Sequence, residues 1–160
     1  MNVNAIVACD KNGGIGINNE LPWPHNETDM KWFRQNTTNS VVIMGRKTWE
    51  SIGFAGLPKR INVVISTQEF GGPDLILSGE MSDIVETVKE RYPSKDMWFI
   101  GGANVYEQAH RLCDNIYLTE FDEGYKCDSF IDLKNMLRGR YEACSNTTGN
   151  MKFSVWSRQQ

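Results

Sequence analysis

The chain contains several short segments in which apolar residues follow one another instead of alternating with polar ones. Val3 to Cys9, Val41 to Met44 and Ile61 to Ile65 are the clearest, and Met97 to Ile100 and Ile116 to Thr119 are similar. Strands of this kind have to be covered on both faces, which is typical of parallel sheets. Because helical segments separate them, the sequence predicts an α/β fold with a mainly parallel twisted sheet and helices on both faces.

The remaining elements are predicted from caps and turn residues. Thr28 is expected to be the N-cap of a helix that places Asp29 in its first turn and runs to about Asn36. Ser82 and Asp83 are expected to cap a second helix. The other predicted elements are a strand at Leu75 to Leu77, helices at Trp49 to Ile52 and Asn104 to Arg111, and an antiparallel edge hairpin of Arg140 to Ser145 with Lys152 to Ser157.

Length and charge limit the class of protein. The 160 residues correspond to one domain, residues 1–160, with a charged share of 23% that is ordinary for globular proteins. A formal net charge of −3 argues against non-specific binding to nucleic acid or to an anionic membrane. No segment predicts a membrane helix or a secretory signal, so we expect a cytoplasmic protein. The four cysteines and two histidines are too scattered to predict a metal site.

Glycine and small polar residues follow four of the predicted strands. They are Gly13-Gly14, Gly45-Arg46-Lys47-Thr48, Ser66-Thr67 and Gly101-Gly102. Ligands of open α/β sheets bind beyond the carboxyl ends of the strands, and glycine lets backbone N–H groups approach an anion closely. Four basic residues and one acid lie between positions 45 and 60. Neither the Walker A nor the G-x-G-x-x-G spacing is present, so these features predict a small anionic ligand and nothing more specific.

The motifs also follow a characteristic order. Gly14-Ile15-Gly16 and Leu21-Pro22-Trp23 precede Asp29, and the sequence VIMGRKTWESIG extends from Val42 to Gly53. They are followed by Leu57-Pro58 with Arg60, a strand ending in Ser66, Ile100-Gly101-Gly102 with Val105-Tyr106, and Leu118-Thr119. This order, over essentially the whole chain, resembles the dihydrofolate reductase family.

The resemblance implies a reaction and an acid for it. NADPH would deliver a hydride to C6 of 7,8-dihydrofolate while N5 gains a proton. Asp29 stands where the family has the acid that holds the pterin through N3 and the 2-amino group and promotes protonation of N5 indirectly. We expect desolvation by Trp23, Trp32 and Phe33 to raise the pKa of Asp29 more than the helix start lowers it. Glu27 is a more distant candidate, because the segment before Asp29 varies in length in the family.

The resemblance also implies a substrate site. Arg60 would bind the α-carboxylate of the substrate's glutamate, which suits a guanidinium fork. Tyr106 would lie near the nicotinamide and the pterin, where its hydroxyl and ring could support positive charge. The residues expected to take part in catalysis are Asp29, Leu21, Trp23 and Tyr106. The residues expected to bind the substrate are Ile6, Val7, Asp29, Phe33, Ile52, Leu57, Arg60, Ile100 and Thr119.

The cofactor site is implied in the same way. Arg46, Lys47 and Thr48 match the cofactor's phosphate-binding loop, and Ser66 and Thr67 match the edge of the adenosine 2′-phosphate site. The pairing of Arg46 with Thr67 favours NADPH over NADH, and the adjacent Gln68 is given no role. Ala103 stands where a third glycine is common. The residues expected to bind the cofactor are Ala8, Ile15, Gly16, Asn19, Leu21, Gly45, Arg46, Lys47, Thr48, Ser51, Ser66, Thr67, Ile100, Gly101, Gly102, Ala103, Asn104, Val105 and Tyr106.

Two loops are expected to control access to this site. Residues 13–23 resemble the mobile loop that closes over the nicotinamide and excludes water, and residues 122–132 resemble the loop that stabilises closure. Asp132 replaces the family's proline at the end of the second loop, so the sequence does not decide whether the two loops make the family's contact. The expected ligands are dihydrofolate and antifolates, and the protein is expected to be a monomer.

Two alternatives come from other functional classes. One is a folate- or NADPH-binding module without turnover, which would need neither Asp29 nor the full set of strand-end glycines. The other is an NADPH-dependent pyrimidine reductase of the same fold. That enzyme would need a ribose-phosphate site where Arg60 and the apolar residues Phe33, Ile52 and Leu57 are found, and these suit an aromatic ring better.

Overall fold

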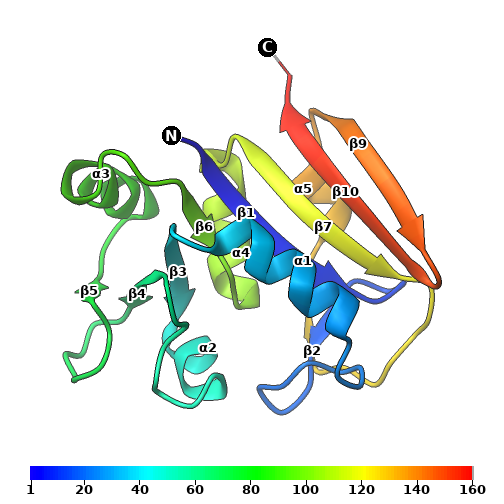
Figure 1. Ribbon diagram of the computed structural model, residues 1–160, viewed down its shortest axis with the longest axis horizontal. Helices are drawn as coiled ribbons and strands as arrows, with labels where there is room; N and C mark the ends of the chain where they lie inside the picture. The colour runs from blue at the N-terminus through cyan, green and yellow to red at the C-terminus, as the bar shows by residue number, and fades with distance from the viewer. Residues whose placement is uncertain (160) are drawn as a thin grey trace.

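An eight-stranded sheet runs through the computed structural model, which describes residues 1–159. Its strand order is β5-β4-β3-β6-β1-β7-β10-β9 (Figure 1). The strands are β1 (Val3–Cys9), β3 (Val41–Gly45), β4 (Ile61–Ile65), β5 (Leu75–Leu77), β6 (Met97–Phe99), β7 (Asn115–Phe121), β9 (Arg140–Thr148) and β10 (Met151–Arg158). All neighbours are parallel except β10, which is antiparallel to both β7 and β9. The predicted α/β class and the antiparallel C-terminal hairpin are confirmed.

Helices cover both faces of the sheet. The helices are α1 (Glu27–Thr37), α2 (Arg46–Ser51), α3 (Met81–Arg91), α4 (Ala103–Ala109) and α5 (Leu133–Leu137), and a short 3₁₀ helix, η1 (His110–Leu112), extends α4. Side chains of α3, α4 and α5 pack with Val7 in one core, while side chains of α1 and α2 pack with Ile6 in another. Successive residues of β1 therefore face opposite layers, as strand geometry requires. Figure 1 shows α1 lying across one face of the sheet.

The helix starts differ from the prediction. The N-cap of α1 is Asn26, not Thr28, and its Oδ1 accepts a hydrogen bond of 3.0 Å from the backbone N–H of Asp29. Asn26 has the extended backbone of an N-cap, so Thr28 falls inside the first turn. Helix α3 begins at Met81 after Glu80, with no side-chain cap, and Ser82 and Asp83 likewise lie within the helix.

Other element boundaries also differ from the prediction. Helix α2 begins at Arg46, directly after the extended Gly45, and not at Trp49. Strand β9 reaches Thr148, so the hairpin turn is shorter than expected. The short antiparallel pair β2 (Gly14–Gly16) and β8 (Ser129–Phe130), and helix α5, were not predicted. These segments are too short to show a hydrophobic period.

Within residues 1–159, no helix combines the length and the apolar character needed to cross a bilayer. The same residues contain no group of three or more His, Cys, Asp or Glu side chains arranged to hold a metal ion.

Candidate active site

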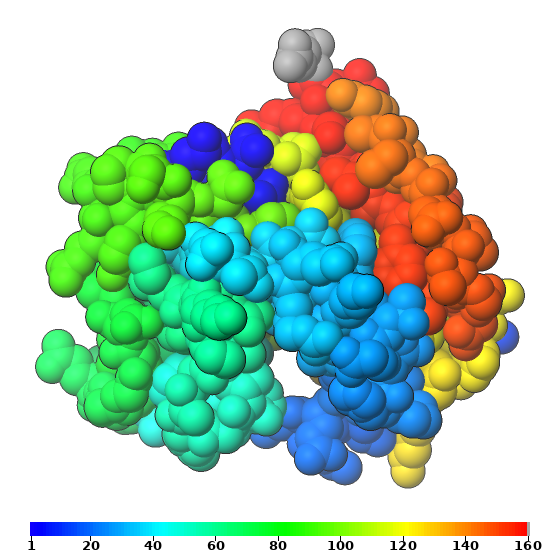
Figure 2. Space-filling model, viewed as in Figure 1, coloured from blue at the N-terminus to red at the C-terminus, as the bar shows by residue number. Residues whose placement is uncertain are grey.

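The carboxyl ends of the central strands meet at one edge of the sheet. Ala8 of β1 is in register with Thr119 of β7, and the Gly45 N–H at the end of β3 donates a 2.8 Å hydrogen bond to the Gly101 carbonyl after β6. Figure 2 shows the surface hollowed beside this edge, between α2, the start of α1 and the loop that follows β2. The strand ends singled out in the sequence are thus brought together, as the parallel topology requires.

Asp29 is a buried acid at this edge. The first turn of α1 holds it with a relative exposure of 8%. Burial raises the pKa of its carboxyl, and the Thr119 hydroxyl opposes this effect only in part. The contact with Thr119 is loose, because the Thr119 hydroxyl is buried and makes no hydrogen bond of good geometry within the described residues. Glu27, by contrast, is exposed and paired with Arg34 at 2.6 Å.

An apolar wall extends from Asp29 along the face of the sheet that α1 and α2 cover. Its members pack in one cluster: Ile6, Phe33, Ile52, Leu57 and Ile100. Five of the predicted substrate residues therefore lie together. Val7 does not join them, because its side chain points into the core on the opposite face. Its neighbour Ile6 takes the place on the substrate side, since residues alternate along β1.

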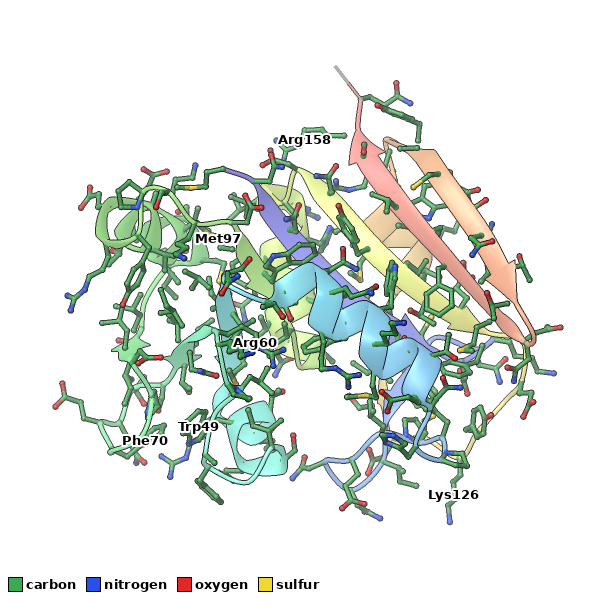
Figure 3. All side chains as sticks on the ribbon, in the orientation of Figure 1. Trp49, Arg60, Phe70, Met97, Lys126 and Arg158 are labelled. Atoms are coloured by element: carbon green, nitrogen blue, oxygen red, sulfur yellow. The ribbon has the colours of Figure 1, made fainter. Side chains whose placement is uncertain are left out.

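Arg60 lies at the far end of this wall, next to the last turn of α1 (Figure 3). Its Nε donates to the Pro58 carbonyl at 3.0 Å, and its Nη1 donates to the Thr37 hydroxyl at 3.0 Å. The guanidinium carbon lies 5.8 Å from the centre of the Phe33 ring. Burial, and to a lesser degree Arg34, lower the pKa of Arg60, but an arginine stays charged at neutral pH. The side chain is therefore held in place while its Nη2 has no protein partner within residues 1–159.

A basic patch follows β3. Arg46 and Lys47 are exposed at the start of α2. The Arg46 Nη1 donates to Gln68 Oε1 at 3.0 Å, and its guanidinium carbon lies 4.6 Å from the centre of the Phe70 ring. Sequence reasoning paired Arg46 with Thr67 and missed Gln68 and Phe70. The register of β3 with β4, in which Gly45 faces Ile65, could have indicated a residue just beyond β4.

Glycines keep the backbone accessible between β3 and β6. Gly101 has a φ of +125°, a conformation that other residues rarely adopt, and a Cβ there would lie 3.5 Å from both the Thr48 hydroxyl and the Tyr106 hydroxyl. A Cβ at Gly45 would press on Val105 Cγ2 at 3.3 Å. A side chain at Gly101 would fill the space beside Thr48, and one at Gly45 would crowd Val105. The open backbone and the nearby Arg46 and Lys47 fit a phosphate-bearing cofactor.

Tyr106 lies beneath the site. Its hydroxyl donates a 2.7 Å hydrogen bond to the Ile6 carbonyl, and its side chain is packed in the core with Val7. Burial raises the pKa of Tyr106, and the nearby Asp29 and Cys9 add to the effect, so the phenol stays protonated. The Tyr106 hydroxyl is thus already hydrogen-bonded to the backbone of β1.

The two loops next to the site are joined. The Asp128 N–H donates to the Gly16 carbonyl at 2.9 Å, and the Asn18 N–H donates to Asp128 Oδ2 at 3.0 Å. The Ile131 N–H donates to the Gly13 carbonyl at 2.9 Å. Asp132, which replaces the family's proline, accepts from the Asn135 N–H as the N-cap of α5. The substitution is therefore compatible with contact between the loops.

Asp10 ties both loops to the end of β1. Its Oδ1 accepts from the N–H groups of Asn12 at 2.9 Å and Gly14 at 2.8 Å, and its Oδ2 accepts from the Tyr125 N–H at 2.8 Å and, more weakly, from the Cys127 thiol at 3.7 Å. Burial acts to raise the pKa of Asp10, but these hydrogen bonds outweigh it and lower the pKa. A Cβ at Gly14 would overlap the Cys127 sulfur, which explains the glycine there. Sequence reasoning gave Asp10 no role.

The remaining predicted residues are spread along the loops and helix starts. Trp23 is buried and stacked on Phe121 with ring centres 4.4 Å apart. Leu21 is 52% exposed and Asn19 is exposed, so neither is packed against the apolar wall. Ile15 and Gly16 lie in β2, Ser51 at the end of α2, Ser66 after β4, and Gly102, Ala103, Asn104 and Val105 at the start of α4.

Comparison with known proteins agrees with this geometry. Residues 2–154 match the family model described as dihydrofolate reductase. The chain is 39% identical over 135 residues to the dihydrofolate reductase of Haemophilus influenzae, covering 84% of this chain and 81% of that one. It is 34% identical over 166 aligned residues to the dihydrofolate reductase of Buchnera aphidicola from Schizaphis graminum, covering 99% of this chain and all of the other (100%).

A solved structure shows the same fold. The dihydrofolate reductase of Enterococcus faecalis, in complex with NADP(H) and RAB-propyl, superposes with a TM-score of 0.83. It is 23% identical, and the match covers 99% of this chain and 96% of that one. The family model and the relatives that match along most of their length show that this chain belongs to the dihydrofolate reductase family and reduces dihydrofolate with NADPH.

Proposed function

We propose that Asp29 is the acid that this chain uses to bind the pterin of dihydrofolate and to favour protonation of N5. The observation that carries the proposal is a buried carboxyl with a raised pKa, next to a buried Thr119 hydroxyl that has no firm partner in residues 1–159. Both groups can exchange hydrogen bonds with the ring edge of a bound pterin. A carboxyl without internal donors gains most from a ligand that brings its own.

Arg60 and the apolar wall would hold the rest of the substrate. The wall formed by Ile6, Phe33, Ile52, Leu57 and Ile100 suits the aromatic ring between the pterin and the glutamate. Arg60 is oriented by Pro58 and Thr37 and keeps N–H donors for the α-carboxylate. Pairing with a bound carboxylate would also offset the cost of holding the guanidinium half-buried beside Arg34. Antifolates with a similar ring edge are proposed to bind at Asp29 in the same way.

NADPH is proposed to bind across the ends of β3 and β6. Gly45, Gly101 and Gly102 would leave room for its phosphates, and Thr48 and the residues at the start of α4 would border them. Arg46, with Gln68, would bind the adenosine 2′-phosphate. When bound, the cofactor supplies the hydride of the reaction. The contribution of the protein is to orient both rings and to exclude water.

Tyr106 is proposed to be a positioning residue beneath the cofactor. Its hydrogen bond to the Ile6 carbonyl fixes the end of β1 against α4. Leu21 and Trp23 are proposed to act through the loop of residues 13–23, with the stacked Trp23 as its anchor and the exposed Leu21 near its tip. The hydrogen bonds of Asp128 support closure of this loop.

The protein is proposed to work as a single-domain monomer in the cytoplasm. One continuous sheet contains strands from both ends of the chain, which supports a single domain. Asp29, Arg60 and Gly101 come from one copy of the chain, which supports a monomer. Cys9, Cys113, Cys127 and Cys144 are free thiols, which suits a reducing compartment.

The proposal is tested by following NADPH oxidation after addition of dihydrofolate, with Asp29→Asn beside the wild type and Glu27→Gln as the matched control. We expect rapid turnover in the wild type and in Glu27→Gln, and slow turnover in Asp29→Asn that partly recovers at low pH. Equal rates for Asp29→Asn and the wild type would overturn the role of Asp29. A loss in Glu27→Gln instead would transfer that role to Glu27.

A further inference from the structure

A second cavity lies at the end of the sheet opposite the active site. Its volume is about 250 Å³. Figure 3 shows Arg158, which lines it, at the upper end of β10, far from Arg60. The residues whose side chains give the cavity its character are His110, Arg111, Asn135, Arg138, Arg140 and Arg158. Four of them are arginines, and none of the lining residues is an acid.

Two of the arginines are held in fixed positions. The Arg140 Nη2 donates to the carbonyls of His110 and Cys113, both at 2.7 Å. The Arg158 Nη2 donates to the carbonyls of Arg111 at 2.9 Å and Cys113 at 2.8 Å. These carbonyls lie in or next to η1, where the last carbonyls of a helix lack partners within the helix. The guanidinium groups of Arg140 and Arg158 are therefore ordered without a carboxylate partner.

The other two arginines are unpaired. Arg111 and Arg138 are exposed, and within residues 1–159 their side chains form neither a hydrogen bond nor an ion pair with a protein group. The nearby carboxylates are Glu107, Asp114 and Asp132, and none pairs with an arginine of the cavity. Asp132 is engaged as the cap of α5, and Asp114 accepts from the Val3 N–H.

Capping of the helix end does not account for four arginines. A helix C-terminus carries roughly half a negative charge, which one or two cations neutralise. Arg140 and Arg158 already fill that role through their hydrogen bonds. Arg111 and Arg138 add positive charge to the same hollow in a protein whose net charge is −3. Nearby carboxylates reduce this charge from a distance, but within residues 1–159 none of them forms an ion pair with an arginine of the cavity.

We propose that this cavity binds a compact phosphate ligand with two or more charges, such as a diphosphate group. Guanidinium groups bind phosphate oxygens through paired N–H donors. Phosphate groups present oxygens in several directions, which suits arginines that approach from η1, from the segment after α5, and from β9 and β10. A volume of about 250 Å³ is below the range of roughly 300–1,000 Å³ for drug-sized ligands, so a small anion fits better than a whole nucleotide.

The test uses the full chain saturated with NADP⁺ and folate, so that the phosphate and carboxylate sites of the active site are filled. Pyrophosphate is titrated at constant ionic strength, because salt screens such contacts. Binding is measured by calorimetry and by amide NMR shifts at Arg138, Gly139 and Arg140. We expect shifts at these amides and at least tenfold weaker binding in Arg111→Ala/Arg138→Ala. Neither side chain makes a hydrogen bond with the described residues, so this variant should fold.

The matched control is Lys89→Ala/Arg91→Ala, which removes two positive charges from α3. Its affinity for pyrophosphate should stay within twofold of that of the wild type. Equal affinity in Arg111→Ala/Arg138→Ala and wild type, or the absence of both binding heat and amide shifts, would overturn the proposal. Citrate provides a further comparison, and tighter binding of citrate than of pyrophosphate would show that the site selects carboxylates instead.

Discussion

Two buried aspartates of this enzyme differ in what surrounds their carboxyl groups. Asp10, with 2% exposure, receives hydrogen bonds from three backbone N–H groups and a thiol. Asp29, with 8% exposure, has only a loose contact with the Thr119 hydroxyl. The pKa of Asp10 is lowered and that of Asp29 is raised. The hydrogen bonds to Asp10 outweigh the effect of its burial, whereas Asp29 has little to oppose desolvation, so the two pKa values are shifted in opposite directions.

The difference indicates that Asp10 serves stability and that Asp29 serves ligand binding. The donors around Asp10 come from the turn after β1, from β2 and from the loop of residues 122–132, so its charge holds the architecture next to the site together. Asp29 has few internal donors, and its hydrogen-bonding capacity is available to a ligand. Arg60 is intermediate, because some of its donors orient the side chain and others face outward.

The largest effect is expected at Asp29. Asp29→Asn should lower kcat at pH 7 by about 10²–10³-fold, since an amide cannot provide the charge through which the acid favours protonation of N5. The deficit should shrink as pH falls, because solvent then protonates the substrate more readily. The pH profile of kcat for both proteins is the measurement, and parallel profiles would contradict the distinction between the two aspartates.

Asp10→Asn should instead act on stability, lowering the free energy of unfolding by about 2–3 kcal/mol at pH 7, since buried N–H donors lose a charged acceptor. A lowered pKa in the folded state contributes stability above the ordinary pKa, and this stability is lost as pH falls through the folded value. The deficit of the variant should therefore shrink in acid.

Urea unfolding at pH 7 and near pH 3 measures this effect, and Asp122→Asn, an exposed position at the start of the loop of residues 122–132, is the control. A stable Asp10→Asn protein with a large loss in kcat would reverse the assignment of the two aspartates.

Arg60→Lys should raise KM for dihydrofolate roughly tenfold with a small change in kcat, because a charged hydrogen bond contributes about 1.5–3 kcal/mol and a lysine cannot form the fork. The hydrogen bonds to Pro58 and Thr37 would also be lost. Steady-state kinetics test this expectation, with the adjacent exposed Lys59→Gln as the control. An unchanged KM would show that Arg60 is structural, like Asp10.

The smallest effect is a gain in stability. A raised pKa means that Asp29 penalises the folded state as pH rises from the ordinary value of 3.8 through the folded pKa. Asp29→Asn should thus be more stable than the wild type at pH 7, by about 1 kcal/mol, and the gain should vanish in acid. Thermal unfolding across this range is the measurement, and a less stable variant at pH 7 would contradict the prediction.

The residue pattern predicted the central strands, whereas contact between the two loops was expected only from the family resemblance. Val41 to Met44 and Ile61 to Ile65 are apolar on both faces, so their strands and the glycine-rich edge follow from local pattern. The pairing of Gly14 with Phe130 joins polar segments more than 100 positions apart, which no local period reveals. Asp10 binds mainly backbone N–H groups, which every residue type can supply, so its partners depend on tertiary structure.

The candidate site divides in the same way. Asp29, Arg60 and the strand-end glycines were predicted from motifs, and their joint position at one edge agrees with the predicted topology. Gln68 and Thr37 were missed because their roles depend on where the Arg46 and Arg60 side chains turn. Val7 was placed on the substrate side by resemblance, and the alternation of β1 turns its side chain away.

The contrast between the two aspartates is tested most directly by NMR titration of their side-chain carboxyl carbons in the ligand-free protein. We expect a pKa above the ordinary value of 3.8 for Asp29 and below it for Asp10. A pKa for Asp29 at or below 3.8, or a pKa for Asp10 above it, would contradict the distinct roles of the two aspartates.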